Sequence, residues 1–200
     1  MATDARLALQ QRLEAVTASI ASAARSAGRS PDDITLIGVT KLFPATVVRQ
    51  ALTLGLVDLG ENRVEELLDK QAALTDLAQQ PRWHLIGTLQ RRKVRQIIGK
   101  TVLIHSVDSV RLAEEIDKRS QAAGLVTDIL LQVNSSEEAN KHGFLPDDSL
   151  TQAAEQLAVC PGIRLRGLMT MAQLTDQPAE TRPVFERTRR LFDQVQDRLA

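Results

Sequence analysis

The sequence predicts an α/β fold, specifically a (β/α)8 TIM barrel with an extra N-terminal helix. Short apolar runs rich in β-branched residues alternate with helical patterns without interruption, which is typical of a parallel sheet covered by helices. No Gly-x-Gly-x-x-Gly motif follows the first apolar run, which disfavours the competing open, doubly wound sheet of dinucleotide-binding domains. Polar residues stand at the carboxyl ends of several predicted strands, as they do around the mouth of a barrel.

The chain begins with a predicted helix over residues 3–27, in which aliphatic residues recur at helical spacing. Gly28 provides a suitable C-terminal cap for this helix. Six apolar runs bounded by turn residues follow, and each is short enough to be a buried strand. The predicted strands cover residues 34–41, 56–62, 83–87, 102–107, 128–134 and 164–171.

A helix with one apolar face follows each predicted strand. Pro44 suits the first turn of the first of these helices, and Gly55 ends it. Asp108 or Ser109 is the expected N-cap of the helix that follows the fourth strand. A closed barrel requires eight strands and we find six, so the last two strands are expected to be missing from the chain. We interpret residues 1–200 as a single domain.

The composition excludes several classes of protein. With 43% hydrophobic residues and a formal net charge of zero, the chain is globular and has no general attraction for nucleic acid or anionic membranes. The basic residues between 91 and 100 have no aromatic neighbours, so a solvated helix face or a surface for an acidic partner is a better interpretation than a nucleic-acid site. One cysteine and the lack of a secretory signal or membrane-spanning run predict a cytoplasmic protein. We expect a monomer.

The first predicted strand ends in a lysine. Alternation along residues 34–41 places Ile37, Val39 and Lys41 on one face, so a core-facing strand would direct Lys41 inward at its carboxyl end. Desolvation there would lower the pKa of the amine and make it a nucleophile for an aldehyde. A strand-end lysine that extends to water is the alternative, and position alone favours that alternative.

The other reactive residue types form no recognisable site. His84, His105 and His142 lie on different predicted elements without the cysteine or carboxylate spacing of a zinc centre, so we expect no metal. Cys160 precedes Pro161-Gly162 in a setting that gives no reason to expect a thiolate.

Six motifs in register resemble those of the pyridoxal phosphate homeostasis protein family, the YggS/PROSC/PipY group, along essentially the whole chain. They are Val39-Thr-Lys41; Gly60-Glu-Asn-Arg-Val-Glu-Glu66; Trp83-His-Leu-Ile-Gly-Thr-Leu-Gln90 with Lys93; Ser106-Val-Asp-Ser109; Gln132-Val-Asn134 with Lys141-His-Gly143; and Gly167-Leu-Met-Thr170. The resemblance implies an alanine-racemase-like barrel of fold type III. It also implies pyridoxal 5′-phosphate as the cofactor, bound as a Schiff base to Lys41.

The same resemblance implies further pocket residues at strand ends: Asn62, His84, Asn134 and Met169. The sequence departs from the family at Thr88, where members usually have histidine in a Gly-His-Leu-Gln motif. It also lacks the Ser-Met-Gly-Met-Ser and Arg-Ile-Gly segments that supply the last two strands and phosphate-binding groups in family members.

The function implied by the resemblance is to hold and release the cofactor in vitamin B6 and amino/keto acid homeostasis, without catalytic turnover. Apoenzymes that depend on pyridoxal phosphate are the implied recipients. The alternative is a pyridoxal-phosphate-dependent amino-acid racemase. Racemisation needs an acid and a base on opposite faces of the substrate, and in racemases a tyrosine from a second domain serves one face. This chain contains no tyrosine, which favours the homeostatic protein.

Overall fold

The structure is a computed structural model, and it describes residues 2–135 and 143–199. Six parallel strands form one sheet in the order β1-β2-β3-β4-β5-β6, so each strand pairs with its neighbours in sequence. A doubly wound sheet reverses its order at a switch point, whereas a barrel does not. The prediction of barrel-type topology is therefore confirmed. The strands are β1 (Gly38–Val39), β2 (Asp58–Glu61), β3 (Arg82–Leu85), β4 (Leu103–Val107), β5 (Thr127–Gln132) and β6 (Ile163–Met169).

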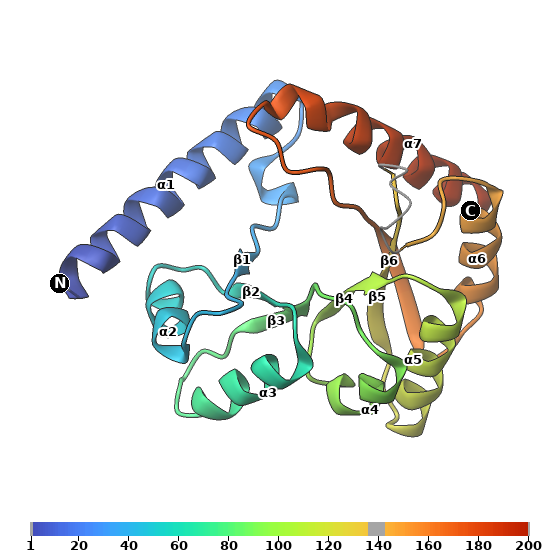
Figure 1. Ribbon diagram of the computed structural model, residues 1–200, viewed down its shortest axis with the longest axis horizontal. Coiled ribbons are helices and arrows are strands. Elements are labelled where there is room, and N and C mark those ends of the chain that lie inside the picture. The colour runs from blue at the N-terminus through green and yellow to red at the C-terminus, as the bar shows by residue number, and fades with distance from the viewer. Residues whose placement is uncertain (1, 136–142, 200) are drawn as a thin grey trace.

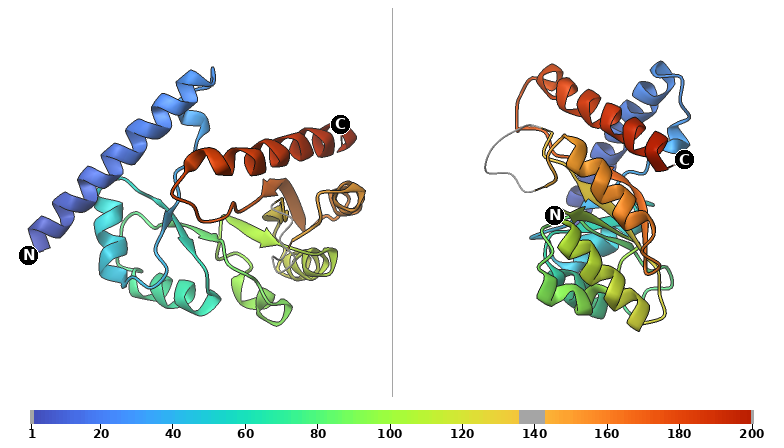
Figure 2. Two further views of the ribbon diagram at one scale, coloured as in Figure 1. Left: turned by 45° about the horizontal axis from the view of Figure 1, so that its top comes forward. Right: turned by 90° about the vertical axis from the view of Figure 1, so that its right-hand side faces the viewer.

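Helices connect the strands and cover the outside of the curved sheet (Figure 1). The α-helices are α1 (Ala2–Ser26), α2 (Ala45–Thr53), α3 (Val64–Ala73), α4 (Val94–Ile97), α5 (Val110–Ala122), α6 (Asp148–Ala158) and α7 (Arg182–Leu199). Three short 3-10 helices, η1 (Pro31–Asp33), η2 (Arg91–Lys93) and η3 (Pro178–Thr181), precede β1, α4 and α7. Figure 2 shows α1 projecting along one flank of the molecule. Within the described residues, no helix combines the length and apolar character that crossing a membrane would require.

The main core lies between the outer face of the sheet and the covering helices. Leu59, Leu85, Ile104 and Ile129 are fully buried, one on each of β2 to β5. Because side chains alternate along a strand, the residues beside them point to the interior of the curved sheet. Because all six strands are parallel, the loops that follow them gather at one edge of the sheet, where the predicted polar residues lie.

The first strand is much shorter than predicted. Of residues 34–41, only Gly38–Val39 forms a ladder, and its partner is β2 alone. Val39 is 46% exposed, so the expectation that it points into a closed core is wrong for this sheet. The physical reason is that β1 lies at an edge of the sheet that the described residues form, where no strand pairs with it on its other side.

Candidate functional site

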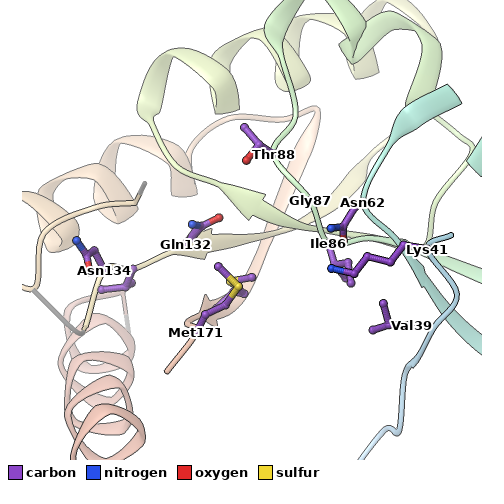
Figure 3. A pocket seen from close by; sticks show the side chains of 11 residues that line it. Val39, Lys41, Asn62, Ile86, Gly87, Thr88, Gln132, Asn134 and Met171 are labelled. Atoms are coloured by element: carbon purple, nitrogen blue, oxygen red, sulfur yellow. The ribbon is translucent and has the colours of Figure 1, made fainter. Parts of the chain in front are cut away.

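A pocket of about 560 Å³ lies at the carboxyl edge of the sheet (Figure 3). Five of the six strands contribute to it through their last residues or the loops that follow them. The lining residues are Val39, Lys41, Asn62, Ile86, Gly87, Thr88, Gln132, Val133, Asn134, Met169 and Met171. Four of the five residues predicted for the cofactor site, Lys41, Asn62, Asn134 and Met169, therefore lie around one cavity.

Lys41 lies in the turn directly after β1. Figure 3 shows its side chain extending along the pocket on the same side as Asn62 and Ile86. The residue is exposed, so the predicted desolvation of its amine in a core does not occur here. The amine is nevertheless directed along an open pocket with a partly apolar wall, and it is accessible to a solute that enters from water.

The pocket wall combines apolar surface with amide and hydroxyl groups. Ile86 and Met169 give it apolar character, while Asn62, Thr88 and Gln132 bring polar side chains. Such a mixture suits a planar heteroaromatic ring that also carries hydrogen-bonding substituents. Thr88, the position where the sequence departs from the family motif, is exposed and lies at the pocket with its hydroxyl group (Figure 3).

Gly87 allows the strand ends to come together at the pocket. A Cβ atom at this position would lie 2.3 Å from the carbonyl oxygen of Asn62 and 2.6 Å from its Cα. Only glycine permits so close an approach of the two backbones. The end of β3 is therefore packed directly against the loop that presents the Asn62 side chain.

His84 lies apart from the pocket lining, contrary to its predicted position at a strand end. It is the third residue of β3 and is 4% exposed, whereas Ile86, two residues later on the same face, lines the pocket. Its Nε2 lies 2.9 Å from Asp58 Oδ1, and its Nδ1 lies 2.9 Å from His105 Nε2. The correction follows from the strand's period of two, which places His84 one layer deeper inside the sheet.

His105 completes this internal chain of polar groups. Burial disfavours the charged ring and the neighbouring His84 adds repulsion, so the pKa of His105 falls from 6.5 to about 4. The Asp58 carboxylate also forms an ion pair with Arg82, with 3.3 Å between Nε and Oδ1. A carboxylate can only accept, so His84 donates from Nε2, and its Nδ1 then accepts the Nε2 proton of neutral His105.

The remaining residues that the sequence singled out lie outside the pocket lining or outside the described residues. Lys141 and His142, from the fifth motif, lie outside the described residues. Burial and the nearby Asp117 and Glu114 raise the pKa of the Cys160 thiol, which agrees with the expectation that it is not a thiolate. Sequence reasoning missed Ile86, Gln132 and Met171 as lining residues, although alternation from the strand ends would have indicated the first two.

Comparison with known proteins agrees with this geometry. The family model described as alanine racemase, N-terminal domain, matches residues 11–200. The pyridoxal phosphate homeostasis protein of Aquifex aeolicus is 40% identical over 186 residues, which cover 93% of this chain and 80% of that protein. The namesake in Pseudomonas aeruginosa is also 40% identical over 186 residues, covering 92% of this chain and 79% of the relative. The chain belongs to the pyridoxal phosphate homeostasis protein family.

Superposition on solved structures shows which known folds this chain resembles. PipY of Synechococcus elongatus PCC7942, in a structure with PLP bound, superposes with a TM-score of 0.77 and 35% identity, covering 92% of this chain and 83% of PipY. An alanine racemase of Clostridium difficile 630 superposes with a TM-score of 0.70 at 15% identity, covering 82% of this chain and 45% of the racemase. That likeness shows the barrel fold alone. The predicted family and the predicted alanine-racemase-like fold are both confirmed.

Proposed function

We propose that this protein binds pyridoxal 5′-phosphate through Lys41 and acts as a carrier that holds and releases the cofactor. The observation that supports this most directly is a lysine amine directed at a pocket whose wall suits a substituted aromatic ring. The structure of PipY, a relative with PLP bound, provides independent support. The cofactor supplies an aldehyde, which condenses with a primary amine with loss of water.

The residues present fit the substituted pyridine ring of this ligand and its aldehyde. The pocket volume of about 560 Å³ exceeds that of a single pyridine ring with its substituents, and amide and hydroxyl side chains are within its wall. In this proposal Lys41 provides the amine. Asn62, Asn134 and Thr88 provide polar contacts, and Met169 contributes an apolar surface for the ring. His84 lies beneath the pocket wall, bonded to Asp58 and His105, and makes no direct contact with the cofactor.

Trapping with borohydride tests the proposal. The reagent reduces the carbon–nitrogen double bond and leaves a permanent label, which peptide mapping locates. We expect the label on Lys41 in the wild type, none in Lys41→Ala, and an unchanged yield in Lys118→Ala, which removes an exposed lysine on α5. A label on any other lysine, or undiminished visible absorbance in Lys41→Ala, would refute the assignment.

Racemisation is the second candidate, and the structural neighbours include racemases. A racemase needs a second proton-transfer group facing the lysine, and the whole chain contains no tyrosine. His84, the substitute that the sequence suggests, is engaged by Asp58 and His105 beneath the pocket wall. A positioned acid contributes roughly a hundred- to ten-thousand-fold. We therefore propose that the protein is not an enzyme, and sustained racemisation of alanine by cofactor-loaded protein, abolished in Lys41→Ala, would contradict this.

We propose further that residues 1–200 form a single cofactor-binding domain and that the protein is a cytoplasmic monomer. The proposed recipients of its cofactor are apoenzymes that depend on pyridoxal phosphate. Solvent access to Lys41 supports a role in transfer, because an incoming amine can reach the site from water. Size-exclusion chromatography with light scattering tests the monomer. Activation of a cofactor-free transaminase by wild-type protein that has been incubated with the cofactor and freed of excess, compared with Lys41→Ala treated in the same way, tests the transfer.

A further inference from the structure

A buried polar cluster forms hydrogen bonds to the backbone of the turn that carries Lys41. It consists of Thr40, Glu61 and Lys70, whose exposed fractions are 6%, 0% and 8%. Lys70 Nζ donates to the carbonyl oxygen of Thr40 over 2.6 Å and forms an ion pair with the Glu61 carboxylate. The Thr40 hydroxyl donates to Glu61 Oε1 over 2.6 Å. Side chains from β2 and α3 therefore meet at the residue that precedes Lys41.

Stability alone gives a poor explanation of this cluster. Lys70 follows Val64 and Leu67 at intervals of three residues on the buried face of α3, where an apolar side chain would normally pack. The desolvation of a buried ion pair commonly offsets its attraction, and replacing both partners with apolar residues is often neutral or stabilising. A buried charge pair at this position is consistent with a requirement for a defined local conformation.

The bonds of the cluster hold the backbone around Lys41. Because the peptide unit is planar, holding the carbonyl of Thr40 also orients the amide nitrogen of Lys41. The amide of Thr40 donates to the carbonyl of Gly60 over 3.0 Å. On the other side of Lys41, the amide of Leu42 donates to Glu66 Oε2 over 3.4 Å. Leu42 has a φ of 67°, the left-handed region that non-glycine residues rarely adopt.

We propose that Glu61 and Lys70 are positioning residues that hold Lys41 aimed at the pocket before the ligand arrives. This inference rests on the proposed binding of pyridoxal 5′-phosphate. In the step that it concerns, the Lys41 nitrogen attacks the aldehyde carbon, a carbon–nitrogen double bond replaces the carbon–oxygen double bond, and the oxygen leaves as one water molecule. A preorganised amine accelerates this step because less conformational freedom is lost in reaching the reactive geometry.

The test distinguishes an effect on the orientation of the Lys41 side chain from general damage to the pocket. Lys70→Met removes the donor to Thr40, and the double variant Glu61→Leu/Lys70→Met removes both buried charges, so that neither is left unpaired. Lys93→Met is the matched control, because Lys93 of η2 pairs with Glu65 of α3, 2.7 Å away, and Lys70 belongs to that same helix α3. The readouts are the rate of the borohydride-trapped label on Lys41 and the affinity for pyridoxine 5′-phosphate, which lacks the aldehyde.

We expect the rate of labelling to fall at least tenfold in the double variant and in Lys70→Met, while the affinity for pyridoxine 5′-phosphate changes less than twofold. Lys93→Met should match the wild type in both measurements. An unchanged labelling rate in the folded double variant would overturn the inference, and so would an equal loss of affinity for the aldehyde-free analogue, which would indicate general damage to the pocket. Absence of any label in the wild type would refute the proposed function instead.

Discussion

Replacement of His105 by glutamine should remove an acid sensitivity that the interior of the sheet creates. His105 lies on β4, in contact with His84, which is in turn bonded to Asp58 and, through it, to Arg82. Arg189 of α7 lines the same open hollow as His105 and is paired with Asp193, 2.7 Å away. The pKa of His105 is about 4 in the folded protein, compared with an ordinary value of 6.5, chiefly because burial disfavours the charged ring.

The direction in which stability changes with pH follows from the difference in the pKa of His105 between the unfolded and the folded protein. The unfolded chain takes up the proton more readily than the folded protein, so stability is fully retained above pH 6.5 and declines as the pH falls towards 4. At pH 5 these two pKa values correspond to a loss of about 2 kcal/mol. Because the His105 ring is half-buried, solvent screening reduces the expected loss to about 1–2 kcal/mol.

Urea unfolding of the wild type and His105→Gln at pH 7.5 and pH 5 measures this loss. Glutamine is neutral at both values and keeps an amide donor for His84 Nδ1. Protonation of groups that do not contact His105 affects both proteins equally, so it cancels in the difference between them. The wild type should lose about 1–2 kcal/mol more than the variant between the two pH values. Equal losses would show that the burial of His105 does not oppose its protonation.

Three further predictions concern the pocket and its turn. Gly87→Ala would place a Cβ 2.3 Å from the Asn62 carbonyl oxygen, so the strand ends must separate; we expect at least tenfold weaker cofactor binding in an absorbance titration and about 2 kcal/mol lower stability in urea. Leu42→Gly should raise stability by about 0.5–1 kcal/mol, because its φ of 67° suits glycine and its side chain is 84% exposed; a lower melting temperature would contradict this. Asn62→Leu should weaken binding of the cofactor by about tenfold, the effect of one lost hydrogen bond, whereas Asn62→Gln should recover part of it; equal binding by wild type and Asn62→Leu would exclude the contact.

The sequence predicted the arrangement of the sheet and the position of the main candidate residue. Alternation of strand and helix patterns is a property of the whole chain, so errors in single boundaries leave the topology unchanged. Lys41 could be placed at the pocket because it follows the first strand. The burial of Lys41 stayed open in the sequence, because whether an edge strand is covered depends on neighbours that a local pattern does not specify.

For His84 and Lys70, the position of the residue within its strand or helix determines where its side chain lies. His84 was assigned to a strand end, although it precedes Ile86 and Thr88 on the same face, and those two reach the pocket. Lys70 was passed over, although it occupies the apolar stripe of its helix after Val64 and Leu67. A lysine on such a stripe is a signal that sequence analysis can use, but its partners Glu61 and Thr40 become known only from the fold.

The unequal pairing of β1 and β5 implies that the two strands differ in their free energy of local unfolding. Strand β1 is held by two register pairs with β2, whereas β5 and β6 pair over six residues. Local opening requires least free energy where few bonds and little buried surface must be given up. Amide hydrogens around Gly38 and Val39 should therefore exchange with solvent deuterium faster than those of β5. Lys41 lies beside the segment that opens most readily, so a ligand anchored there would slow the exchange of the first strand more than that of the distant ones.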